Sequence, residues 1–267
     1  MSSSRTETLS PIAEWQAPTP EQFRDEIMPI RQPAVLRGVA NEWPLVVAAK
    51  RDPDRAMALV AANATSELAD VLRADATQQG QFHYDENGSL NFIRGRGNIA
   101  GLIAALRDQQ GSDEPCAIVA QGLIAERHVP GFAKVHSMPF APVTAEPRLW
   151  IGNAAKVATH NDPTDNVAVV AAGRRRFTLF RPEAEPYLYM GPKDPTPAGT
   201  PVSMVYVTAP DLKRFPLYPQ ALESAQEAEL SPGDAIFIPR DWFHHVEALE
   251  RFNVLVNYWW DATEIVA

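Results

Sequence analysis

The segment that decides the fold is Gly233-Asp234-Ala235-Ile236-Phe237-Ile238-Pro239-Arg240-Asp241-Trp242-Phe243-His244-His245-Val246. It predicts a turn at its first two residues and then an apolar strand, Ala235–Ile238. Pro239 ends this strand, because proline has no amide hydrogen to give to a sheet. His244 and His245 follow between aromatic and apolar residues. Such a pair either packs against aromatic rings at the end of a strand or supplies a metal ligand.

A second motif, Thr159-His160-Asn161-Asp162, lies between the expected strands Arg148–Gly152 and Asn166–Ala171. In extended backbone, alternate residues project from the same face, so His160 and Asp162 can bind one ion as an imidazole and a carboxylate. A third ligand must come from elsewhere in the chain, and the pair His244-His245 contains a candidate in His244. Two histidines and one carboxylate leave open coordination positions, which is the arrangement of non-heme Fe(II) oxygenases.

The chain contains another His-x-Asp sequence, His83-Tyr84-Asp85. It is followed by Asn87-Gly88, which predicts the tip of a β-hairpin between residues 82–84 and 89–92. Asp85 is then explained as a turn residue. We therefore place the metal site at His160 and Asp162.

The region around these motifs is rich in short strands. The expected strands of residues 116–267 are Ala117–Ala120, Arg148–Gly152, Asn166–Ala171, Arg176–Phe180, Ala235–Ile238 and Asn253–Tyr258. Many short strands without long helices favour a sandwich or a barrel. Period-two spacing predicts that Val167, Val169, Ile236 and Ile238 fill the interior of that barrel.

Residues 1–115 predict a mixed annex of helices and short strands. A helix is expected to begin at Thr19, with Pro20 in its first turn and Gln22 completing a capping box. Residues 33–38 predict a strand that ends in a glycine turn, and residues 54–63 and 98–110 predict amphipathic helices. The proline-rich residues 182–231 predict an insertion that carries one helix around Ala221–Ala228. Residues 1–267 are thus expected to form a single domain.

Composition limits the partners of this protein. The formal net charge of −9 argues against a nucleic-acid partner, because a phosphate backbone attracts a basic surface. The single cysteine excludes an internal disulfide. No apolar run is long enough for a membrane span, and no leader-like apolar segment follows the first residues, so we expect a cytoplasmic protein.

Together these segments resemble the cupin-like JmjC oxygenases, a family that includes the asparaginyl hydroxylase of hypoxia-inducible factor. The resemblance covers much of the chain: residues 33–38 with Trp43-Pro44, residues 149–152, Gly173 with residues 177–182, residues 210–216, residues 233–246, and residues 256–259. It implies a mainly β fold with α elements, namely a double-stranded β-helix (cupin or jelly-roll) core with an N-terminal helical annex.

The resemblance also implies the cofactors and their residues. His160, Asp162 and His244 would hold Fe(II). In the family the ligand is the histidine two residues after a tryptophan, here Trp242, so His244 is selected and His245 would point away. Arg175 would bind the far carboxylate of the co-substrate 2-oxoglutarate, since a guanidinium grips a carboxylate with paired hydrogen bonds. Asn166 and Asn257 match asparagines that line the pocket in relatives. Two departures are Val157, where a hydroxyl residue is common, and Ile118 or Val119, where relatives often have a tyrosine.

The expected function is therefore hydroxylation of a protein side chain or a small molecule by an Fe(II)- and 2-oxoglutarate-dependent oxygenase. Two alternatives stay open at this stage. One is a metal-binding cupin of other activity, such as an isomerase or a dioxygenase that does not use 2-oxoglutarate. The other is a binding module without catalytic activity. The identity of the substrate and the oligomeric state are left open.

Overall fold

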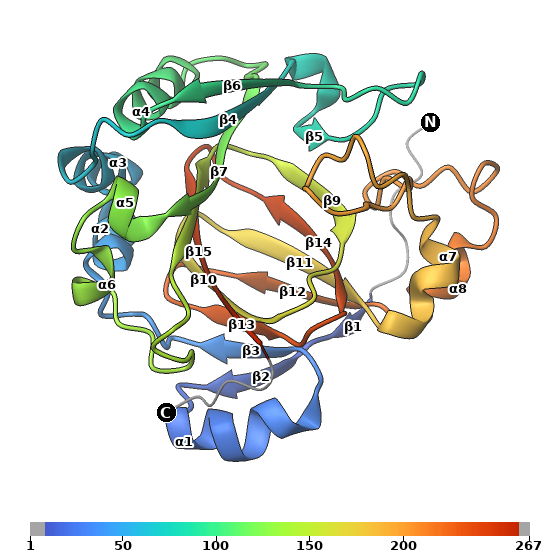
Figure 1. Ribbon diagram of the computed structural model, residues 1–267, viewed down its shortest axis with the longest axis horizontal. Coiled ribbons are helices and arrows are strands. Elements are labelled where there is room, and N and C mark those ends of the chain that lie inside the picture. Colours follow the sequence, from blue (N-terminus) through green and yellow to red (C-terminus); the bar gives the residue numbers. More distant parts are fainter. Residues whose placement is uncertain (1–8, 262–267) are drawn as a thin grey trace.

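The structure is a computed structural model that describes residues 9–261, and its centre is a pair of facing β-sheets (Figure 1). The six-stranded sheet has the order β1-β12-β11-β14-β9-β5, and the nine-stranded sheet has the order β2-β3-β13-β10-β15-β8-β7-β4-β6. Strands that follow one another in the chain largely alternate between the sheets, as in a jelly roll. The predicted mainly β, cupin-type fold is confirmed.

Eight strands from the second half of the chain form the core of the jelly roll. They are β8 (Arg148–Gly152), β9 (Lys156–His160), β10 (Asp165–Ala172), β11 (Arg175–Phe180), β12 (Gln226–Leu230), β13 (Ala235–Ile238), β14 (Phe243–Ala248) and β15 (Asn253–Trp260). Each expected strand of this half is present. The strand expected at Ala117–Ala120 is longer than predicted and forms β7 (Ala117–Ile124).

The first half of the chain extends both sheets. Its strands are β1 (Ser10–Pro11), β2 (Ala13–Gln16), β3 (Ala34–Arg37), β4 (Ala69–Ala74), β5 (Gln81–Phe82) and β6 (Ile93–Gly97). Of these only β3 and the hairpin at residues 82–92 were predicted. Strands β4 and β6 were missed, because β4 pairs with β7 and with β6 across residues that are distant in sequence.

The helices of the first half begin where the sequence places their caps. Helix α1 (Pro20–Gln22) has the predicted capping box on Thr19 and continues through a π turn (Phe23–Ile27) and a 3-10 turn (Met28–Ile30). Helix α3 (Pro53–Ala62) and helix α4 (Ile99–Asp108) match the predicted helices. The further helical elements are α2 (Pro44–Arg51), α5 (Ala125–His128), α6 (Phe132–Val135) and a 3-10 turn at Ala76–Gln78.

Helices α2 to α6 gather on one side of the molecule in Figure 1, and they cover the outer face of the nine-stranded sheet. Side chains of α2, α3 and α4 share one core cluster with strands β10, β13 and β15. A second cluster lies between the two sheets and includes Ala168, Ile236 and Phe177. Both faces of the central strands β10 and β13 are buried, which makes this part of the nine-stranded sheet a rigid platform for side chains that point into the jelly roll.

The predicted positions of two residues in strand β10 are wrong. Val167 and Val169 do not fill the jelly-roll interior; they pack in the outer cluster with the helices, and the interior residues of β10 are Ala168 and Val170. Period-two spacing separates the faces of a strand but cannot say which face is inner when both are buried. Ile236 and Ile238 do lie in the interior cluster, as predicted.

The helix expected around Ala221–Ala228 lies earlier, as α8 (Tyr218–Leu222), after a 3-10 turn at Pro182–Ala184 and helix α7 (Glu185–Leu188). Residues 226–230 form strand β12 instead. Their Ala, Glu and Leu side chains favour a helix by propensity, but Ala228 and Leu230 are buried while Glu229 points out. Pairing along β11 overrides the local preference. Within residues 9–261 no helix has the length and apolar character that crossing a membrane would require.

Candidate metal centre

The two histidines of the candidate site come from neighbouring strands of the six-stranded sheet. His160 is the last residue of β9, and His244 is the second residue of β14. The antiparallel register pairs His244 with His160. Their ring centroids are 4.4 Å apart. The sheet therefore brings together two side chains from distant parts of the sequence.

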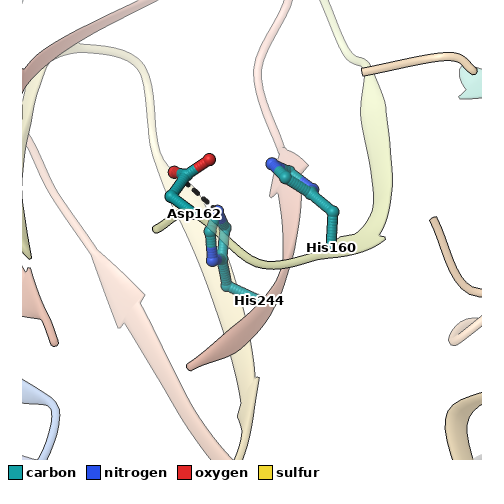
Figure 2. A group of neighbouring side chains, drawn as sticks. All are labelled: His160, Asp162 and His244. Carbon is teal, nitrogen blue, oxygen red and sulfur yellow. Dashed lines mark ion pairs between the residues drawn. The ribbon is translucent and has the colours of Figure 1, made fainter. Parts of the chain in front are cut away.

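Asp162 joins the histidines from the loop that follows β9 (Figure 2). One ligand atom from each of His160, Asp162 and His244 lies within 4.8 Å of the others. The expectation that Asp162 shares extended backbone with His160 is wrong, because the strand ends at His160. The loop is held instead by a hydrogen bond of 2.9 Å from the Asp241 amide to the Asp162 carbonyl. Within residues 9–261 no other group of three His, Cys, Asp or Glu side chains is close enough to share an ion.

The hydrogen bonds of the histidines leave the correct ring atoms free for a metal. Nδ1 of His160 lies 2.8 Å from the Ala158 carbonyl oxygen, and Nδ1 of His244 lies 3.2 Å from the Trp242 carbonyl oxygen. A carbonyl only accepts, so each Nδ1 carries the hydrogen and each Nε2 keeps its lone pair. Nε2 of His244 faces Oδ2 of Asp162 at 3.8 Å. The donor set suits a divalent metal of the first transition row.

Burial keeps the His244 ring neutral. The ring is buried, and this loss of solvation together with the nearby His160 ring lowers the pKa of His244 well below its ordinary value. A metal needs the neutral imidazole, because a protonated nitrogen has no lone pair to offer. The His244 ring is therefore in the neutral form, which could bind a metal ion at neutral pH.

His245 lies on the opposite face of β14. It is buried, and its Nε2 lies 3.8 Å from the Glu247 carboxylate, away from His160 and Asp162. The structure therefore brings His244, and not His245, to the candidate metal centre. The spacing from Trp242 in the sequence predicts the same histidine.

A cavity of about 280 Å³ adjoins the three candidate ligands. Arg175, the first residue of β11, lines this cavity and is only 6% exposed. No carboxylate pairs with Arg175 anywhere in residues 9–261, and its Nε has no hydrogen-bond partner there. Burial lowers the pKa of Arg175 to about 10, so the guanidinium is still charged at neutral pH. An unpaired buried cation that faces a cavity is suited to an anionic ligand.

The two predicted asparagines lie in the same cavity. Nδ2 of Asn257 donates a hydrogen bond of 3.0 Å to Oδ1 of Asn166. Oδ1 of Asn257 is buried and has no partner among the described residues. All six residues predicted for the site, His160, Asp162, Asn166, Arg175, His244 and Asn257, therefore surround one space.

The structure adds residues that sequence reasoning missed. Strand β7 has a bulge between Ala120 and Leu123, and Gln121 within it lines the cavity. It lies close to where relatives were expected to have a tyrosine. Trp150 and Trp259 also line the cavity, with ring centroids 5.1 Å apart. Trp259 could have been found from its period-two spacing to Asn257; the bulge has no comparable local signal.

The second His-x-Asp sequence has a structural role. Nε2 of His83 lies 2.9 Å from the Ser203 carbonyl oxygen, and the ring is buried. Asp85 accepts hydrogen bonds from the amides of Asn87 and Ser89, at 2.8 Å and 2.9 Å. The prediction that Asp85 is a turn residue is confirmed.

The protein is a jelly roll in which two histidines and one carboxylate converge beside a cavity. This combination of fold and candidate metal centre is typical of cupin-like proteins. The chain matches the Cupin-like domain family over residues 20–264, and it belongs to that family. The resemblance drawn from the motifs is thus confirmed.

Three relatives show how far the similarity extends. Lysine-specific demethylase JMJ31 of Arabidopsis thaliana is 26% identical over 277 residues, which cover 91% of this chain and 48% of that protein. HSPB1-associated protein 1 of Homo sapiens is 38% identical over 121 residues, or 45% of this chain and 24% of that protein. tRNA wybutosine-synthesizing protein 5 of Mus musculus is 38% identical over 102 residues, or 38% of this chain and 29% of that protein. The chain spans about half the length of the first relative, and less of the other two.

Proposed function

We propose that this protein is an Fe(II)- and 2-oxoglutarate-dependent oxygenase that hydroxylates a protein side chain or a small molecule. One observation carries the proposal. The candidate ligands His160, Asp162 and His244 share a cavity with Arg175, a buried guanidinium without a carboxylate partner in residues 9–261. A metal site alone fits many cupins, but a metal site beside an unpaired cation suits a co-substrate that is both a chelator and an anion.

Each residue has a distinct task in this proposal. His160, Asp162 and His244 would hold Fe(II) and leave positions open for other ligands. Arg175 would fix the far carboxylate of 2-oxoglutarate, and Asn166 and Asn257 offer amide groups in the same cavity. The bound iron and co-substrate would supply the oxidation of an unactivated C–H bond, which no protein side chain performs alone.

The apolar walls of the cavity serve the same chemistry. Phe177, Val246 and Leu255 line it between the sheets and keep bulk water from the reacting groups. Val157 also lines the cavity, in the position where relatives commonly have a hydroxyl residue. Valine cannot donate a hydrogen bond, so the polar contacts to 2-oxoglutarate would come from Arg175, the two asparagines and Gln121.

The surroundings of the site bear on the substrate. A surface hollow of about 610 Å³ shares Gly122, Trp150, Asp162 and Trp259 with the cavity. It can receive a group attached to a larger molecule. The relatives bear the names of a lysine-specific demethylase and of a tRNA wybutosine-synthesizing protein. The net charge of −9 disfavours a polyanion, so we propose a protein side chain or a small molecule rather than RNA.

Anaerobic titration with Fe(II) tests the metal and the co-substrate together. The proposal expects a visible metal-to-ligand charge-transfer band only when both Fe(II) and 2-oxoglutarate are present. It also expects the protein to convert 2-oxoglutarate to succinate in air. Fe(II) binding without the band, and without succinate, would favour a cupin of other activity. No Fe(II) binding would favour a binding module.

A further inference from the structure

We propose that Trp259 is a positioning residue, whose indole N–H holds the Asp162 carboxylate in the orientation that binds the metal. This inference rests on the proposed function, because it gives the carboxylate a metal to bind. It assigns a role to a side chain that does not itself offer a metal ligand.

The contact is a direct hydrogen bond between side chains from different parts of the fold. Nε1 of Trp259 donates to Oδ2 of Asp162 at 3.1 Å. The same carboxylate oxygen faces Nε2 of His244 at 3.8 Å. Within residues 9–261 no other side chain donates a hydrogen bond to Asp162. In the part of the chain that the structure describes, the indole is therefore the one hydrogen-bond donor that restrains this carboxylate.

Asp162 needs such a restraint more than the two histidines do. His160 and His244 are strand residues whose Nδ1 atoms bond to the carbonyls of Ala158 and Trp242. Asp162 lies in the loop after β9, and its side chain is 23% exposed, compared with 7% for His244. Without a fixed partner the carboxylate would rotate and exchange hydrogen bonds with water.

Trp259 is itself held rigidly. It lies in β15, in register with Asn166 of β10, inside the nine-stranded sheet. Its ring meets that of Trp150 edge-to-face at 5.1 Å. The sheet can thus fix the orientation of the Asp162 side chain, which lies on a loop, through this hydrogen bond. Partners of this kind orient metal ligands in many metalloproteins.

The test compares Trp259→Phe with Trp150→Phe in Co(II) titrations of the full chain. Both variants keep an aromatic ring in the cavity wall, but only Trp259→Phe removes a hydrogen bond to Asp162. We expect Trp259→Phe to weaken Co(II) binding roughly 10-fold and to change the visible Co(II) spectrum. Trp150→Phe should bind within about twofold of the wild type with the same spectrum.

Unchanged affinity and spectrum in Trp259→Phe would overturn the positioning role. An equal loss in Trp150→Phe would also overturn it, because the effect would then come from ring packing. A wild type that fails to bind Co(II) contradicts the proposed function instead.

If Trp259→Phe does not fold, indole ¹H–¹⁵N spectra of the metal-free protein decide the question. Asp162→Ala removes the acceptor from a partly exposed loop position and should shift one indole resonance upfield. Zn(II) should shift that same resonance in the wild type. Indole spectra that Asp162→Ala leaves unchanged would overturn the proposal.

Discussion

His160 and His244 face each other across the antiparallel pairing of β9 and β14, with ring centroids 4.4 Å apart. Asp162 completes the group from a loop that the Asp241 amide holds in place. The loop between β13 and β14 therefore supports both sides of the candidate metal centre. It carries Asp241, and it presents the Trp242 carbonyl that orients His244.

The adjacent histidines give a test of which one binds the metal. We expect His244→Ala and His160→Ala to abolish stoichiometric Fe(II) binding, because each removes one of three ligands. His245→Gln should retain Fe(II) binding, since His245 lies on the other face of β14. Metal analysis after anaerobic loading checks this. Unchanged metal content in His160→Ala would contradict the assignment of His160 as a ligand and would support the alternative of a binding module without catalytic activity.

Replacing Arg175 should separate co-substrate binding from metal binding. Arg175→Met removes the buried guanidinium, and we expect 2-oxoglutarate to bind about 3 kcal/mol more weakly, or roughly 100-fold. Fe(II) affinity should be unchanged. The free energy of unfolding of the metal-free protein should not fall, because the charge that is lost has no carboxylate partner in residues 9–261.

Arg174→Met is the matched control for that variant. Arg174 is 49% exposed and pairs with Glu229 and Glu250. We expect it to bind 2-oxoglutarate as the wild type does, in calorimetric titrations under anaerobic conditions. Equal losses in both variants would contradict the assignment of Arg175.

Buried histidines should make the stability depend on pH. Burial lowers the pKa of His136, whose Nδ1 donates to the Phe132 carbonyl and whose Nε2 accepts from the Leu45 amide. Burial also lowers the pKa values of His83 and His128. In the unfolded chain these rings bind protons as the pH falls below roughly 6.5, while the folded rings stay neutral. The contribution of these histidines to the free energy of unfolding is therefore fully present above that pH. It is lost as the pH falls further, by at most about 1.4 kcal/mol per group and pH unit.

Urea unfolding measured at neutral and at mildly acidic pH checks this dependence. His136→Gln keeps a donor and an acceptor but cannot be protonated, so it should reduce the loss of stability on acidification. A loss of the same size in the wild type and in His136→Gln would assign the pH dependence to other groups.

Gly173, in the turn before β11, should be sensitive to substitution. Its φ is +72°, and a Cβ atom there would lie 2.5 Å from the Phe252 carbonyl oxygen. We expect Gly173→Ala to lower the free energy of unfolding by about 3 kcal/mol or more. Gly88 has a φ of +81° with nothing within 4 Å of a Cβ atom, so Gly88→Ala should cost only about 1 kcal/mol. Chemical denaturation compares the two, and equal costs would contradict the steric argument.

Local features of the sequence were sufficient for much of the fold. The capping box at Thr19, the hairpin at Asn87-Gly88 and the strand Ala235–Ile238 depend on neighbouring residues, and each is present. The sequence also named the residues of the candidate site, because they follow the spacing of a known family, and the structure places these residues around one cavity. Local patterns were therefore sufficient to select the side chains that converge on this cavity.

Tertiary structure alone decided how those side chains are arranged. The strand β12 replaced an expected helix because β11 offers it backbone partners, and Val167 faces outward because helices cover the second face of β10. Asp162 reaches the histidines from a loop, and Trp259 meets it from the opposite sheet. Sequence by itself determined the ligand types, since these are a property of residues. Their orientation came from contacts between segments far apart in the chain, which no local pattern encodes.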